Sequence, residues 1–174
     1  MDKIPISKLD AAKRQLETAL KLFFENGDPV SIHTLVSASH ELLAVLCRKR
    51  GVTPSMLKDQ VLKDIRPGKE KYWIKLNNKY ANHFKHATKD ADATIDFNPE
   101  INEILILDAC QMYMRIVGSN TFLQRTFCVW VHAKDPNMFI HTLEELDFLE
   151  ERRHELPIND KPAFLELSKQ YWKE

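Results

Sequence analysis

The chain has 174 residues, of which 44% are hydrophobic, and its 25 Lys and Arg residues are balanced by 25 Asp and Glu residues. A chain of this length fits one compact domain and can build a core without disulfides or a structural metal. The net charge of zero excludes a global electrostatic attraction to nucleic acid or to an anionic membrane. A polyanionic partner would therefore have to meet a local basic patch.

The three cysteines and the start of the chain indicate a cellular location. Cys47, Cys110 and Cys128 lie far apart in apolar or helical stretches. This pattern suits a reducing compartment and provides neither a disulfide framework nor a Cys-x-x-Cys metal site. The first residues lack the apolar run of a signal peptide, and no uninterrupted run of roughly 18 apolar residues occurs to span a bilayer. We therefore expect a cytoplasmic protein without a membrane segment.

Capping signals predict a pair of helices at the start of the chain. Ser7 is a suitable N-cap for a helix that runs to about Asn26, and apolar residues recur along it at steps of three and four. Asp28, followed by a proline, predicts the start of a second helix that runs to about Lys49 and ends before Gly51. We expect these two helices to form an antiparallel hairpin.

Prolines, glycines and capping residues divide the rest of the chain into further helices. Only four glycines occur, and no Asn-Gly or Asp-Gly turn joins alternating apolar runs, which argues against a sheet. The expected helices span about Pro54–Lys63, Lys69–Ala87, Pro99–Val117, Asn120–Ala133, Asn137–His154 and Ala163–Trp172. The sequence thus predicts an all-α fold, a single bundle of about six to seven principal helices built on the first hairpin.

The densest group of polar side chains lies at the end of the helix expected over Lys69–Ala87. It consists of Lys79, Asn82, His83, Lys85 and His86. The two histidines are three residues apart, so their imidazoles can face one another, and imidazole acts as a general base or acid near neutral pH. With lysines to bind phosphate, the group suits metal-independent phosphodiester cleavage. The alternative is that cations gather here because they favour the negative end of the helix dipole.

Two histidines on the second helix form a separate pair. His33 and His40 are seven positions apart, which aligns them on one side of the helix but leaves about 10 Å between them along its axis. This spacing cannot chelate a metal ion from one helix. We expect both at the border of a buried face, bonded to neighbouring groups. Weaker alternatives are a pocket role for His33 and a metal site shared with His83 or His86.

The segments Leu9–Leu16, Asp28–Leu35 and Asn82–Ala87 together carry a resemblance to a known superfamily. In their layout the chain resembles the HEPN superfamily (higher eukaryotes and prokaryotes nucleotide-binding) of small helical bundles. The resemblance implies one domain over residues 1–174, with a core at about 7–118 and a C-terminal helical extension at 119–174. It also implies binding of RNA or a nucleotide and, in active members, a metal-independent ribonuclease site at a homodimer interface.

The chain departs from the motif of the active members of that superfamily, which carry an arginine a few residues before a histidine. Here Lys79 and Asn82 precede His86, and no arginine stands nearby. Lysine lacks the planar guanidinium that binds phosphate through two parallel bonds. Arg125 and His132 satisfy the literal spacing, but a pattern this short arises easily by chance, and the pair ranks below the His86 site.

The leading hypothesis is a homodimeric protein that binds RNA or a nucleotide and cleaves RNA without a metal or another cofactor. His86 would act as general base or acid, Lys79 would stabilise phosphate charge, and Asn82 would orient the substrate. Further substrate contacts would come from Lys85, His83 and His33. The alternative hypothesis is a non-catalytic helical module, such as an antitoxin or a regulatory partner, that binds another protein.

Overall fold

The structure, a computed structural model, describes residues 3–52, 78–88, 91–136 and 153–171. In this part of the chain it contains six α-helices and no strand. The helices are α1 (Lys8–Phe24), α2 (Pro29–Arg50), α5 (Lys79–Lys85), α6 (Ile101–Val117), α7 (Phe122–Lys134) and α9 (Lys161–Tyr171). The prediction of an all-α fold is confirmed, and the arrangement is compatible with a single helical bundle.

The predicted capping residues begin and end the first two helices. Ser7 forms a capping box with Asp10, in which each side chain bonds the backbone of the other residue. At the start of α2 the Asp28 carboxylate accepts a hydrogen bond from the Ser31 N–H at 2.7 Å. Gly51 ends α2 with a φ of 66°, a left-handed conformation that glycine adopts without steric cost.

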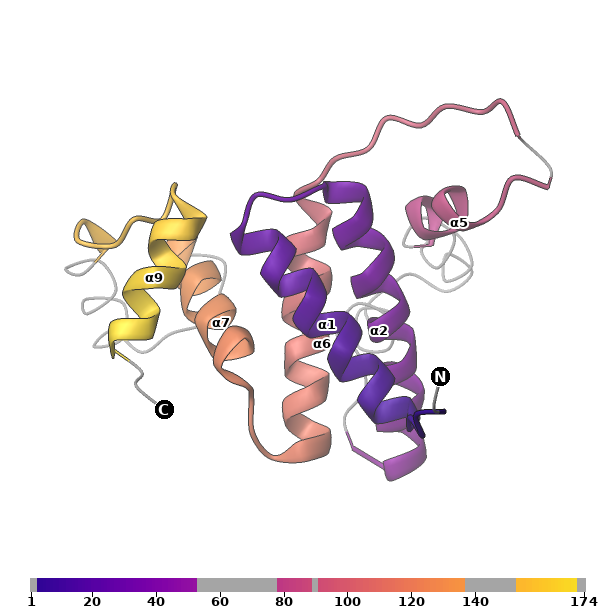
Figure 1. Cartoon of the computed structure of the whole chain (residues 1–174), viewed down its shortest axis with the longest axis horizontal. Helices are drawn as coiled ribbons and strands as arrows, with labels where there is room; N and C mark the ends of the chain where they lie inside the picture. Colours follow the sequence, from indigo (N-terminus) through magenta and orange to yellow (C-terminus); the bar gives the residue numbers. More distant parts are fainter. Residues whose placement is uncertain (1–2, 53–77, 89–90, 137–152, 172–174) are drawn as a thin grey trace, which may run out of the picture.

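Helices α1, α2 and α6 form the centre of the molecule. α1 runs antiparallel to α2, α6 runs parallel to α2, and the three lie side by side (Figure 1). Their facing apolar side chains make one buried core, to which α7 and α9 add further residues. α5 packs against α2 on the side of the bundle away from α7 (Figure 1). The centre therefore separates α5 from the C-terminal helices.

Ring contacts attach α7 to α1. The centroids of contacting rings lie 5.1 to 6.5 Å apart, mostly in edge-on arrangements that suit the quadrupoles of aromatic rings. The four rings are those of Phe23, Phe24, Phe127 and Trp130. All four side chains are almost fully buried, so this cluster forms an apolar link between α1 and α7.

Several predicted boundaries differ from those observed. The expected helices over Pro54–Lys63 and most of Asn137–His154, and the start of Lys69–Ala87, lie outside the described residues. α9 begins at Lys161, two residues earlier than expected, because the Asp160 carboxylate caps the N–H of Ala163 at 3.0 Å. The predicted end of α6 is confirmed, since Gly118 follows it with a φ of 87°.

The composition of α2 also satisfies a simple test for a membrane-spanning helix. It has 22 residues, and its most apolar window reaches a mean hydropathy of 1.4. The core helix of a soluble protein passes the same test. Within the bundle α2 contacts α1, α5 and α6, and 44% of that window is buried, so its hydropathy alone does not identify α2 as a membrane-spanning helix.

Candidate functional site

Aromatic rings anchor the short helix α5 to α2. The rings of Tyr80 and Phe84 stack at a centroid distance of 6.4 Å on the inner side of α5. Both meet the His33 ring of α2 edge-on, at 5.8 and 5.6 Å. Phe97, in the segment before α6, lies 5.3 Å from the His33 ring. We call the rings of His33, Tyr80, Phe84 and Phe97 the aromatic box. These contacts fix which face of α5 is turned toward solvent.

The His33 imidazole sits at the base of this box and has no exposed surface. Its Nδ1 lies 2.8 Å from Oδ1 of Asn102, whose own Nδ2 donates to the carbonyl of Pro29 at 3.0 Å. Because the Asn102 oxygen is the acceptor, Nδ1 of His33 carries the proton and Nε2 does not. Nε2 is buried without a hydrogen-bond partner.

This environment favours the neutral form of His33. Burial lowers the pKa of its imidazole, the bond to Asn102 opposes that shift, and the positive charge of Lys85 adds to it. A charged ring would sit among apolar rings with one nitrogen unpaired. The predicted substrate contact by His33 stays a prediction, but the structure places its ring beneath α5 rather than on the exposed face.

The second histidine of α2 forms a similar link to α6. Nε2 of His40 lies 2.8 Å from Oδ2 of Asp108, and both side chains are at most 1% exposed. The two histidines are therefore bonded to neighbouring side chains, as expected. Their position was predicted wrongly, because they lie inside the core rather than at its border. Their partners, Asn102 and Asp108, were missed; the available signal was two polar residues six positions apart within an apolar helix.

The other predicted site residues lie together on and just after α5. Lys79, Asn82, Lys85 and His86 are exposed, whereas His83 is half-buried against the ring of Phe84, at 5.9 Å. His86 is the C-cap residue and has extended backbone angles. The Lys79 ammonium lies 5.7 Å from the centroid of the Tyr80 ring. Among the described residues, none of these cationic side chains forms an ion pair.

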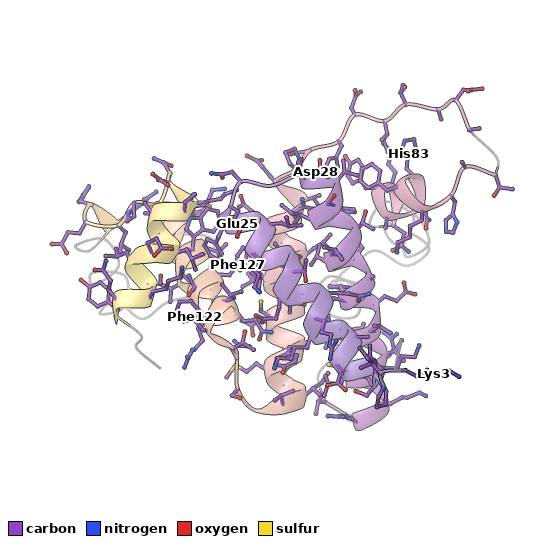
Figure 2. The ribbon with its side chains drawn as sticks, in the orientation of Figure 1. Lys3, Glu25, Asp28, His83, Phe122 and Phe127 are labelled. Atoms are coloured by element: carbon purple, nitrogen blue, oxygen red, sulfur yellow. The ribbon has the colours of Figure 1, made fainter. Side chains whose placement is uncertain are left out.

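Arg125 and His132 do not join this group. Both lie on α7, on the far side of the central helices from α5 (Figure 1). Figure 2 shows His83 at one end of the molecule and two labelled residues of α7, Phe122 and Phe127, toward the other. The second-ranked pair therefore cannot act with the residues of α5 within one chain.

The described residues contain no group of three or more His, Cys, Asp or Glu side chains that could hold a metal ion. His33 and His40 point into the bundle and each bonds a residue of α6. His86 is exposed beyond the end of α5. The alternative of a metal site shared between α2 and the end of α5 gains no support from this geometry.

The chain was compared with protein-family models, curated proteins and solved structures, and none of the three comparisons found a match. The resemblance to the HEPN superfamily therefore remains a prediction from sequence.

Proposed function

We propose that the outer face of α5 binds single-stranded RNA through its phosphates and cleaves it without a metal. The observation that supports the proposal is a cluster of basic residues, with no acidic residue among them, on a helix that aromatic contacts hold against α2. Residues 78–88 contain two lysines and two histidines and no acidic residue. In a chain of zero net charge, such a segment supplies the local basic patch that a polyanion requires.

The aromatic box also favours contact with phosphates over contact with bases. Tyr80 and Phe84 are occupied by His33 and Phe97, so neither ring is free to stack a base. Lys79, Lys85 and the Asn82 amide remain exposed as hydrogen-bond donors. Binding by such donors tolerates many sequences and weakens with salt, because each neutralised phosphate releases counterions.

The length of α5 assigns the lysines to different phosphates. Lys79 begins the helix and His86 follows its last residue, which separates them by about 10 Å along the axis. In the proposal Lys85, next to His86, neutralises the phosphate that reacts. Lys79 binds a neighbouring phosphate and, with Asn82, holds the strand in position.

The proposed cleavage uses the 2′-hydroxyl of the RNA as the nucleophile. His86 takes the proton from this hydroxyl, and the 2′ oxygen attacks the adjacent phosphorus. The bond from phosphorus to the 5′ oxygen breaks, that oxygen takes a proton from a water molecule, and the protonated His86 gives its proton to the hydroxide that remains. The products are a 2′,3′-cyclic phosphate and a 5′-hydroxyl end. Lys85 stabilises the additional negative charge that develops on the phosphate oxygens.

Binding is tested by fluorescence anisotropy with a labelled single-stranded RNA. A double substitution, Lys79→Ala with Lys85→Ala, should reduce the magnitude of the slope of log K against log salt by about 1.4, since each phosphate contact contributes about 0.7. The matched control replaces Lys8 and Lys21, both exposed on α1, and should leave the slope unchanged. Equal effects of the two double variants would reject α5 as the binding face.

Cleavage is tested with the same RNA in EDTA. The wild-type chain should yield 2′,3′-cyclic phosphate ends, and His86→Ala should slow their release about 100-fold or more, the range that general acid–base catalysis contributes. Asn120→Ala provides a control distant from α5. If RNA binds at α5 but neither protein cleaves it, the catalytic half of the proposal is wrong and the binding half stands.

A further inference from the structure

A pocket of about 250 Å³ has no residue of α5 in its lining. It is enclosed by the turn between α1 and α2, the start of α6 and the first residue of α9. Its apolar wall consists of Phe23, Pro29, Ile32 and Pro99. The volume is slightly below the range of about 300 to 1,000 Å³ that is usual for ligand sites, so an occupant would be small.

The half-buried ammonium group of Lys161 lines this pocket. Nζ of Lys161 lies 3.8 Å from the centroid of the Phe23 ring and 5.8 Å from that of Trp130. Among the described residues it has no hydrogen bond or ion pair, although an ammonium carries three donors. Burial lowers the pKa of Lys161, which the charge of Glu103 partly opposes and that of Lys134 reinforces.

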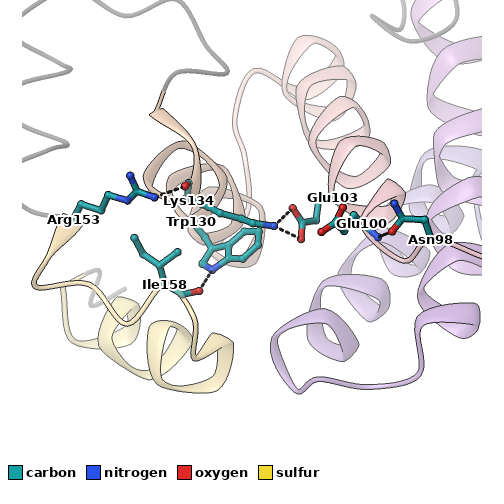
Figure 3. A network of polar contacts seen from close by, with 7 residues as sticks. All are labelled: Asn98, Glu100, Glu103, Trp130, Lys134, Arg153 and Ile158. Carbon is teal, nitrogen blue, oxygen red and sulfur yellow. Dashed lines mark hydrogen bonds and ion pairs between the residues drawn. The ribbon is translucent and has the colours of Figure 1, made fainter.

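The Glu103 carboxylate, which also lines the pocket, already has a partner. Both oxygens of Glu103 accept hydrogen bonds from Nζ of Lys134, at 2.7 and 2.8 Å (Figure 3). The position of Lys134 is in turn fixed, because its ammonium lies 5.2 Å from the ring of Trp130 and its carbonyl accepts from Arg153 at 2.9 Å (Figure 3). Lys161 thus lies near the negative charge of Glu103 but donates to no acceptor among the described residues.

We propose that this pocket binds a small monocarboxylic acid with a branched apolar body. The carboxylate accepts hydrogen bonds from Lys161, and the apolar body packs against Phe23 and Ile32. Glu100, exposed at the rim, adds a negative charge that disfavours a dianion, so a carboxylate fits better than a phosphate monoester. This site is separate from the proposed RNA face and does not depend on it.

The test follows the Trp130 indole N–H by NMR, since this group donates to the carbonyl of Ile158 at 3.0 Å (Figure 3) and the centroid of its ring lies 5.8 Å from Nζ of Lys161. Isovalerate should shift the resonance saturably, with a Kd of about 1 mM, a value suited to a small ligand. Isovaleramide has nearly the same shape without the charge and should bind at least about tenfold more weakly, a difference of about 1.4 kcal/mol.

Substitutions of Lys161 test whether its ammonium group binds the carboxylate. Lys161→Met keeps the apolar stem and should abolish the isovalerate shift, whereas Lys161→Arg keeps the charge and should retain it. The control is Lys169→Met on the same helix, an exposed residue paired with Glu166 at 2.6 Å, which should bind as the wild type does. If Lys161→Met fails to fold, binding by Lys161→Arg and the comparison of isovalerate with isovaleramide still test the proposal.

Three outcomes of the isovalerate experiments would overturn the proposal, and a fourth would come from a titration with inorganic phosphate. The first three are no saturable shift with isovalerate, equal binding of the acid and the amide, and unchanged binding by a folded Lys161→Met variant. Inorganic phosphate is titrated in parallel. Tighter binding of phosphate than of isovalerate would show that the site selects charge alone and would also reject the carboxylate assignment.

Discussion

Nδ1 of His33 and Oδ1 of Asn102 lie 2.8 Å apart, and this bond connects α2 to α6 directly beneath α5. Asn102 continues the connection through its Nδ2, which donates to the carbonyl of Pro29 at the start of α2. One amide side chain therefore pairs with Nδ1 of a buried imidazole and also bonds the first turn of α2. The same side chain also lines the pocket that contains Lys161.

Replacing Asn102 by alanine should destabilise the fold by about 2 to 3 kcal/mol. The change leaves the Nδ1–H of His33 without its acceptor, and an unpaired buried polar group costs about 1 to 3 kcal/mol. Urea denaturation at neutral pH measures the difference. Asn82→Ala, a change of the same kind at an exposed position of α5, should cost less than about 0.5 kcal/mol. Similar losses in both variants would contradict the role assigned to Asn102.

The depressed pKa of His33 predicts a loss of stability in acid. Because the folded pKa lies below the unfolded value of about 6.5, the unfolded chain binds the proton more readily. The contribution of His33 is fully present above pH of about 6.5 and is lost as pH falls toward the folded pKa, with a slope of at most about 1.4 kcal/mol per pH unit. Urea denaturation of the wild type and of His33→Met over this range checks the sign: the advantage of the wild type should shrink in acid. A difference that stays constant would show that His33 does not titrate in this way.

Removing the carboxylate of Asp108 should be the more damaging change to the core. Asp108→Ala removes the partner that lies 2.8 Å from His40 at a fully buried position, and breaking such a buried pair by removing one partner costs about 3 to 5 kcal/mol when the pair is charged. Asp108→Asn keeps an acceptor oxygen, so it should cost less. Thermal unfolding by circular dichroism ranks the three proteins. If the Asn variant were as unstable as the Ala variant, the bond to His40 would not be the main contribution of Asp108.

Phe84→Ala should loosen α5 while leaving the central helices protected. The ring contacts His33 and Phe97 at 5.6 and 5.2 Å, and α5 is too short to be stable without such packing. Hydrogen exchange should show faster amide exchange in Lys79–Lys85 and unchanged protection in α1 and α6. Tyr171→Ala, at a position 75% exposed, is the control. Equal protection of α5 in Phe84→Ala and wild type would mean that the ring does not anchor the helix.

Helix ends were predictable because their causes are local. Ser7, Asp28 and Gly118 act on backbone groups only a few residues away, so sequence alone identifies them. The polar face of α5 was likewise visible as a spacing within one short segment. The bond between His33 and Asn102 joins residues 69 positions apart, and no local pattern indicates which helix will face which.

The pocket at Lys161 was not predicted for the same reason, because it is formed by residues far apart in the sequence. Lys161 and Phe23 come from opposite ends of the described chain and meet only when α9 packs beside α1. In the sequence, Lys161 is one ordinary lysine before a proline, and its lack of an acceptor depends on the pairing of Glu103 with Lys134. Tertiary contacts, not residue type, therefore define this site.

The two bonds between α2 and α6 have a consequence for the alignment of the helices. His33 and His40 meet Asn102 and Asp108 in the same order along parallel axes, and further along Arg50 reaches the carbonyl of Ile116 at 3.3 Å. Apolar side chains alone would tolerate sliding by one turn, about 5.4 Å. Such a slip would separate both polar pairs inside the core. These four side chains therefore permit a single register of α2 against α6. The same register fixes where His33, on which α5 packs, lies along the bundle.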